Sequence, residues 1–160
     1  MRFFIRAANA LDLACVGAVV GDHFEQSAPI ATGVQERLAL AWKLSRQVWL
    51  AADRQGVPAA LFGAAPLEDD ASTGQLWTLF LAAFEKDQND GRAALRLVLD
   101  EMLREFDRLE TRVDARREWV LETLHSVGFT IDPVVPRWAG DVSHRVWLAR
   151  SPDPPVKIPN

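Results

Sequence analysis

The stretch between residues 84 and 129 constrains the fold more than any other part of the chain, because it predicts a helix, a strand and a second helix in close succession. One apolar face has the i, i+3, i+4, i+7 spacing of a buried helix and consists of Leu95, Val98, Leu99, Met102, Leu103 and Phe106. Leu109, Thr111 and Val113 then alternate as in a short strand. Asp114 is placed to cap the second helix and Gly128 to end it. The inner face of this second helix is formed by Val120, Leu124 and Val127.

A short polar segment with the pattern Gln88-x-x-Gly91-x-Ala93 precedes the first of these helices, and we interpret it as a loop. Gly91 lets a ligand approach the backbone, and the small Ala93 keeps the first turn uncrowded. The amides and the dipole at a helix start favour an anion such as a pyrophosphate. The charges do not decide whether a pyrophosphate binds here, because two acidic and two basic side chains cancel: Lys86, Asp87, Asp90 and Arg92.

The rest of the chain predicts further strands and helices in a β-α-α-β-β-β-α-β-α-β-β order. Strands are expected at residues 3–5, 47–52, 57–64, 75–81, 129–131 and 144–149, and helices at 10–20 and 34–45. Asn9 with Asp12 fits a helix cap. We assign residues 1–150 to a single domain and the proline-rich residues 151–160 to an extended tail.

Composition excludes several classes of function. The net charge of −4 gives no reason to expect direct readout of nucleic acid, and no apolar run is long enough to cross a bilayer. Three histidines and one cysteine show no metal-ligand spacing. The single cysteine, Cys15, excludes an internal disulfide and suits a reducing cytoplasm; its apolar neighbours place it in the core.

The order of strand, Gln-x-x-Gly-x-Ala segment, helix, strand, helix and Gly128-Phe129 resembles the coenzyme A-binding half of the GNAT (general N-acetyltransferase) superfamily. The resemblance implies an α/β (α+β) fold: a mixed, mostly antiparallel twisted sheet with helices on both faces. It also implies acetyl-CoA or CoA as cofactor, with the pantetheine arm on the backbone of Leu79 and Leu81, beside a gap between strands 75–81 and 109–113. The pyrophosphate would be bound by Gln88, Asn89, Asp90, Gly91, Arg92 and Ala93.

Catalysis by the usual GNAT route would need an acid for the departing thiolate and a base for the amine. Many GNAT enzymes place a tyrosine four residues before the Gly-Phe pair. Leu124 stands at that position here, and the chain contains no tyrosine. Glu85, just past strand 75–81, is our candidate base.

The same segment is also similar to a branch of GNAT-fold proteins from short-tailed bacteriophages, associated with virion morphogenesis or the contents of the capsid. The matching residues are Met102, Leu103, Phe106, Asp107, Leu109, Trp119, Leu121, Leu124 and Gly128. With Leu124 in place of the acid, this similarity favours a non-catalytic virion or assembly component. Such a protein would occupy the bacterial cytoplasm during infection, or the virion.

Other protein subunits are the partners expected in that case, contacted through Trp138, Pro154 and Pro155. The alternative is an acetyl-CoA-dependent N-acyltransferase that acts on an amine of a small molecule or protein.

Overall fold

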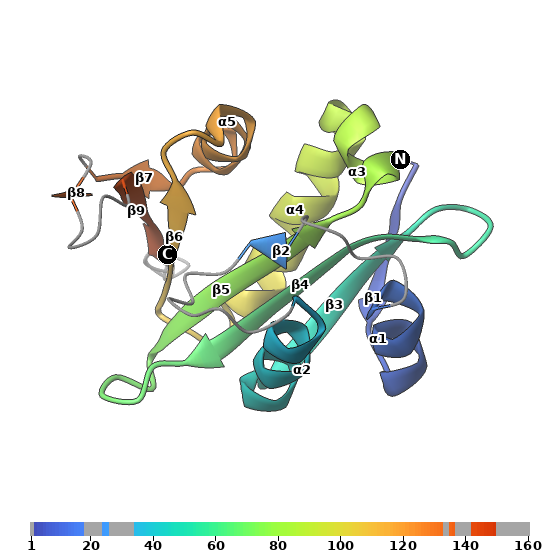
Figure 1. Cartoon of the computed structure of the whole chain (residues 1–160), viewed down its shortest axis with the longest axis horizontal. Coiled ribbons are helices and arrows are strands. Elements are labelled where there is room, and N and C mark those ends of the chain that lie inside the picture. Colours follow the sequence, from blue (N-terminus) through green and yellow to red (C-terminus); the bar gives the residue numbers. More distant parts are fainter. Residues whose placement is uncertain (1, 18–23, 26–33, 133–134, 137–141, 150–160) are drawn as a thin grey trace, which may run out of the picture.

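A nine-stranded sheet forms the centre of the molecule (Figure 1). The computed structural model describes residues 2–17, 24–25, 34–132, 135–136 and 142–149. The strands are β1 (Phe4–Ala7), β2 (Phe24–Glu25), β3 (Gln47–Ala52), β4 (Pro58–Pro66), β5 (Thr73–Phe80), β6 (Arg108–Asp114), β7 (Thr130–Ile131), β8 (Val135–Pro136) and β9 (Val142–Ala149). The helices are α1 (Ala10–Gly17), α2 (Val34–Leu44), α3 (Ala82–Lys86), α4 (Gln88–Met102) and α5 (Glu118–Ser126).

The sheet is mixed and mostly antiparallel, which confirms the predicted fold class. Its main strand order is β1-β3-β4-β5-β6-β9-β7, with β2 beside β5 and β8 beside β9. Every strand pair is antiparallel except that of β5 and β6. The antiparallel strands β3, β4 and β5 follow one another in the chain, as short connections allow, whereas the parallel β5–β6 pair requires the crossover through α3 and α4.

Helices cover both faces of the sheet, since side chains alternate between the faces along each strand. On one face, Phe62 and Phe80 pack with the inner residues of α4 and α5. On the other face, Leu61 and Leu79 pack with Leu38 of α2, in a core that also includes residues of α1. Figure 1 shows these two layers, with α3, α4 and α5 on one side and α1 and α2 on the other. No helix in the described ranges is long and apolar enough to cross a membrane.

The predicted helix faces are confirmed, but the start of the second helix is not. All residues named for these faces are buried except Leu103, which is half-buried, but Leu103 and Phe106 lie beyond the end of α4 and Val127 beyond the end of α5. Gly128 follows α5 with a φ of +109°, as a helix-ending glycine should. Asp114, however, ends β6 and accepts the amide of Arg116 at 2.9 Å, while Arg117 is the N-cap residue of α5. The turn between Asp114 and Arg117 therefore separates strand from helix, and the predicted cap was placed too early.

The start of α1 forms the cap that the sequence predicts. The amide of Asp12 donates to Asn9 Oδ1 at 3.0 Å, and the amide of Asn9 donates to Asp12 Oδ2 at 2.9 Å. Arg6, from β1, adds two hydrogen bonds of 2.7 Å to the Asp12 carboxylate and thereby holds the Asp12 pKa below its usual range. Cys15, three residues further along α1, is exposed, so its predicted burial is wrong.

We expect Asp12→Asn to lower the free energy of unfolding near pH 7 by about 1–2 kcal/mol, because it weakens a charged pair and the cap together. Since the folded pKa of Asp12 is depressed, the ionised carboxylate stabilises the fold above the unfolded pKa of about 3.9 and loses this effect as the pH falls further. Urea titrations at several pH values should therefore show variant and wild type converging in acid. Asp100→Asn, at an exposed position of α4, is the control and should change stability little.

Candidate functional site

Strands β5 and β6 pair only where they begin and then separate. The parallel register comprises three residue pairs: Thr73 with Arg108, Gly74 with Leu109, and Gln75 with Glu110. Beyond this register β5 stays paired to β4, and β6 stays paired to β9 along its whole length. Each strand is thus held by its outer neighbour while the middle of the sheet divides, and Figure 1 shows the β6–β9 part of the sheet turning away from β5. The predicted gap between these strands is present.

The backbone groups of β5 that face this gap belong to its even-numbered residues. Leu81, just past the end of β5, donates its amide to the carbonyl of Ala59 in β4 at 2.9 Å. Leu67, just past the end of β4, donates its amide to the carbonyl of Thr73 in β5 at 3.0 Å. Hydrogen-bonding direction alternates along a strand, so Leu79 also faces β4, whereas Thr78 and Phe80 face away from it. The predicted backbone contacts at Leu79 and Leu81 are corrected accordingly, because those backbone groups serve the β4 ladder.

Strand β2 occupies part of this gap-facing edge. Phe24 lies opposite Leu79, and Glu25 lies opposite Thr78, in a two-residue antiparallel pairing. No strand was predicted here from the sequence, because two residues are too few to show an alternating pattern. Any ligand that hydrogen-bonds to the backbone of Thr78 has to displace this pairing.

Aromatic rings line the sheet beside the gap, on the face covered by α5. Phe80 of β5 stacks on Phe84 of α3, with ring centroids 4.9 Å apart, and lies 5.2 Å from the ring of Trp119 in α5. The guanidinium of Arg117 lies 5.9 Å from the Trp119 ring, and burial lowers the Arg117 pKa. These contacts connect β5 to α5 across the separation of the strands.

The segment predicted as a phosphate-binding loop is the first part of helix α4. Asp87 is the N-cap residue, and its side chain accepts the amide of Asp90. The backbone amide of Arg2 donates to Asp90 Oδ2 at 2.9 Å, and the Arg2 side chain lies 3.4 Å from Asp87. The two acidic residues of this segment thus have structural roles: Asp87 caps the helix, and both Asp87 and Asp90 bind Arg2 near the start of the chain. The amides of Gln88 and Asn89 lie in the first helical turn, before the first i→i−4 hydrogen bond, so they have no acceptor within the helix.

Within this helical segment the residues have different environments. Gly91 is buried, and a Cβ at this position would lie 3.1 Å from the Phe84 ring, so its size serves packing between α3 and α4. Ala93 is exposed and Arg92 is half-buried. The Nε of Arg92 is buried and makes no hydrogen bond within the described part of the chain. A buried donor of this kind suits an anion.

The candidate catalytic positions lie on two different helices. Glu85 is half-buried on α3, the short helix that follows β5 directly. Leu124 is buried in the core, so the position of the family's tyrosine acid holds an apolar side chain directed into the protein interior. Glu85 stays a predicted base.

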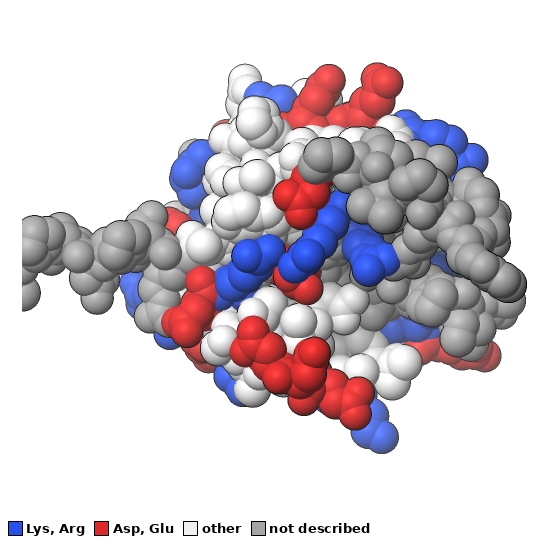
Figure 2. All heavy atoms as spheres, turned by 90° about the vertical axis from the view of Figure 1, so that its left-hand side faces the viewer, with Lys and Arg blue, Asp and Glu red and all other residues white. Residues whose placement is uncertain are grey.

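A small cavity of about 260 Å³ adjoins the base of the gap on the face of the sheet that carries α1 and α2. It is lined by Leu67, Gln75, Glu110, Thr111, Arg112 and Arg145. Figure 2 shows the side of the molecule on which β6 and β9 lie, with Lys and Arg atoms gathered across its middle. The sequence analysis missed this cavity, because its residues come from distant strands.

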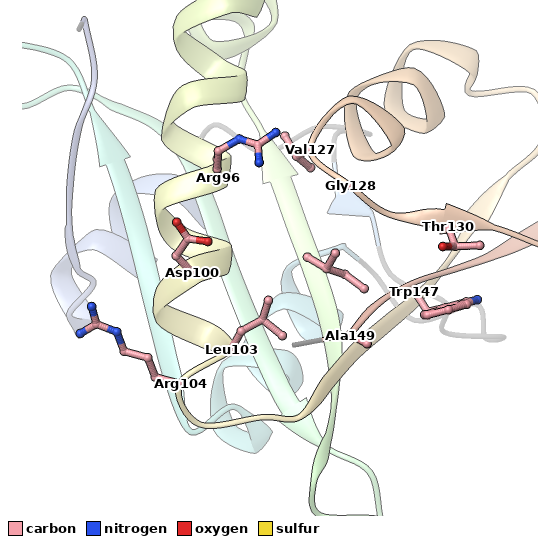
Figure 3. Close-up of a pocket in the computed structure, with 10 residues that line it drawn as sticks. Arg96, Asp100, Leu103, Arg104, Val127, Gly128, Thr130, Trp147 and Ala149 are labelled. Carbon is pink, nitrogen blue, oxygen red and sulfur yellow. The ribbon is translucent and has the colours of Figure 1, made fainter. Parts of the chain in front are cut away.

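A second cavity of about 630 Å³ lies between α4, the end of α5 and strands β7 and β9 (Figure 3). Arg96 extends from α4 toward Val127 and donates to the carbonyl of Ser126 at 3.1 Å, while Asp100 follows on the same helix and Arg104 lies in the turn after it. This cavity borders the second half of α4, so it is separate from the predicted phosphate site at the helix start.

Several predictions concern residues that the structure does not describe. Trp138, Pro154 and Pro155, the predicted partner contacts, lie outside the described residues, as does the tail at 151–160. Among the described residues, no group of three or more His, Cys, Asp or Glu side chains could hold a metal ion.

No protein-family model and no curated protein sequence matches the chain. Solved structures do match it. The spermidine N-acetyltransferase of Vibrio cholerae in complex with CoA and spermine has a TM-score of 0.69 at 11% identity, over 92% of this chain and 95% of that one. The ribosomal-protein-S5-alanine acetyltransferase of Vibrio fischeri has a TM-score of 0.69 at 12% identity, over 93% of each chain.

These neighbours overturn the favoured prediction from the sequence. They are acetyltransferases, and the fold match covers almost the whole chain, so they contradict the prediction of a non-catalytic virion or assembly component and favour the alternative as a proposal. The GNAT part of the resemblance is supported: the chain has the GNAT fold.

Proposed function

We propose that this chain is an acyl-CoA-dependent N-acyltransferase. The observation that carries the proposal is the separation of β5 from β6 after three residue pairs, which leaves the backbone of β5 beyond Gln75 turned toward a gap instead of toward β6. A linear, amide-containing arm can add to such an edge as an extra strand would. The structural neighbours also support the proposal, since one of them is an N-acetyltransferase solved with CoA.

The residues at the gap fit a CoA molecule in two places. The gap-facing backbone of Thr78 and Phe80 suits the two amides of the pantetheine arm. The amides of Gln88 and Asn89 at the start of α4, with the guanidinium of Arg92, suit the pyrophosphate. Bound acyl-CoA would supply an acyl group activated as a thioester. Because β2 pairs at the same edge, we expect CoA binding to displace Phe24 and Glu25 from β5.

The chain's own groups then have to prepare the amine and stabilise the developing negative charge on the carbonyl oxygen. Only a neutral amine attacks, and Glu85 is the predicted acceptor of its proton. A gap-facing amide of β5 is suited to donate to the carbonyl oxygen. Leu124 cannot supply a proton, but this is tolerable because thiols are acidic compared with alcohols (a cysteine thiol has a pKa of about 8.5), so the sulfur can depart as a thiolate.

Calorimetric titration with acetyl-CoA, and separately with CoA, tests the proposal. We expect a Kd on the order of micromolar for the wild type. Asn89→Glu adds a carboxylate at the exposed start of α4 and should weaken binding about tenfold or more, because it opposes both the pyrophosphate and the amides that hold it.

Leu97→Glu is the matched control, since it places the same charge on the same helix at an exposed position away from the helix start. It should leave the affinity unchanged. Gly91 is unsuitable for such a test, because a larger side chain there would disrupt the contact with Phe84. Absence of acetyl-CoA binding at millimolar ligand, or equal losses in the two variants, would contradict the proposed function.

A further inference from the structure

The small cavity at the base of the gap is a charged recess on the face opposite α4. Its position follows from the sheet register: Gln75 and Glu110 are the last residues that pair β5 with β6, and Thr111 and Arg112 are the first beyond them. The cavity therefore adjoins the point where the strands separate.

Strand alternation explains why charged side chains gather here. Leu109 and Val113 of β6 point into the core shared with α4 and α5. The residues between them, Glu110 and Arg112, point to the other face. Arg145 of β9 lies directly opposite Arg112 in the antiparallel β6–β9 pairing, so its side chain is on the same face.

The charges in this recess do not balance. Glu110 Oε2 accepts a hydrogen bond of 2.9 Å from Arg145 Nη2 and lies 3.5 Å from Arg108 Nε. Its carboxylate raises the Arg145 pKa, with a smaller effect from Asp132. Arg112 is exposed, and the charged residues that line the cavity, Glu110, Arg112 and Arg145, carry a net charge of +1.

Two further carboxylates near this face do not neutralise Arg112. Asp114, two residues along β6, is bound by Arg116 at 2.7 and 3.0 Å. Asp132 accepts the indole N–H of Trp147 at 3.3 Å. Arg112 and Arg145 are thus like charges directly opposite one another, an arrangement that costs stability unless an anion lies between them.

We propose that this recess is an acceptor subsite for a carboxylate, so that the substrate is a small amine carrying a carboxylate group. The inference rests on the proposed function. An acyl group held in the gap is open to attack from the face away from α4, and Arg112 with Arg145 would fix the acceptor's carboxylate there by paired, charge-assisted hydrogen bonds. Glu110 keeps Arg145 in position through their hydrogen bond of 2.9 Å. A polyamine would meet repulsion from the same arginines.

An acceptor panel measured after the acetyl-CoA titration tests this subsite. The panel contains amino acids, the corresponding amino-acid amides, and spermidine, with thiol release and product mass as readouts. We expect kcat/KM for the carboxylates to exceed that for the amides by about tenfold or more. Arg112→Gln should raise KM for the carboxylates about tenfold and leave the acetyl-CoA Kd unchanged.

Arg54→Gln, an exposed arginine in the β3–β4 turn, is the control and should change neither quantity. Failure to bind acetyl-CoA would overturn the proposed function and the subsite together. Binding of acetyl-CoA combined with equal use of amides, preference for spermidine, no reaction with any carboxylate, or an unaltered KM in Arg112→Gln would overturn the subsite alone.

Discussion

We expect the Gly63→Ala variant to lose about 3 kcal/mol or more of its free energy of unfolding, which is a large part of what holds a small domain together. Gly63 of β4 lies opposite Trp77 of β5, and the indole covers it. A Cβ at Gly63 would fall on the Trp77 ring itself. The ring cannot move aside, because it is buried and its Nε1 donates to Ser45 Oγ at 2.7 Å. Urea titration of the purified variant measures the loss.

A double-mutant cycle identifies the cause of this loss. Trp77→Phe removes part of the ring, so Gly63→Ala should cost at least about 1 kcal/mol less in that background than in the wild type. Gly63→Ala alone within about 0.5 kcal/mol of wild type would show that the Trp77 ring does not cover Gly63 as described.

The sequence predicted the long elements well, because each carries enough residues to show its period. Strand β3 was predicted with its observed bounds, and β4 and β5 to within two residues at each end. Helix α3 and strands β2 and β8 were missed, because pieces of five or two residues show no periodicity. Asp114 was taken for a cap because it precedes a helix, yet its carboxylate serves a turn.

The site was less predictable, since its parts depend on pairing between strands. Whether an amide of β5 faces β4 or the gap depends on the register of the strand pairing, which the sequence of β5 alone does not contain. The sequence analysis therefore could not recognise that the backbone groups of Leu79 and Leu81 face β4. The helix start at Gln88 was hidden by Gly91, a residue that usually indicates a loop. Arg112 and Arg145 come together only through the β6–β9 pairing, so a motif search could not find them.

Adjacent proline substitutions at Leu79 and Thr78 of β5 are expected to destabilise the protein by very different amounts. Leu79→Pro removes an amide that faces β4 in the middle of the sheet and should destabilise the protein by about 3 kcal/mol or more. Thr78→Pro removes an amide that faces the gap, so the β4 ladder is kept and the loss of stability should be much smaller.

Binding of acetyl-CoA, in contrast to stability, is expected to depend on the amide of Thr78. Thr78→Pro should weaken its binding about tenfold or more, because the variant lacks the gap-facing donor proposed for the pantetheine arm. Thr78→Val, which keeps the amide and nearly the same shape, should bind like the wild type. Calorimetry on the folded variants decides the point. Unchanged affinity in Thr78→Pro would remove the β5 edge from the cofactor site, whereas reduced affinity that Thr78→Val does not share would identify the backbone, and not the side chain, as the binding group.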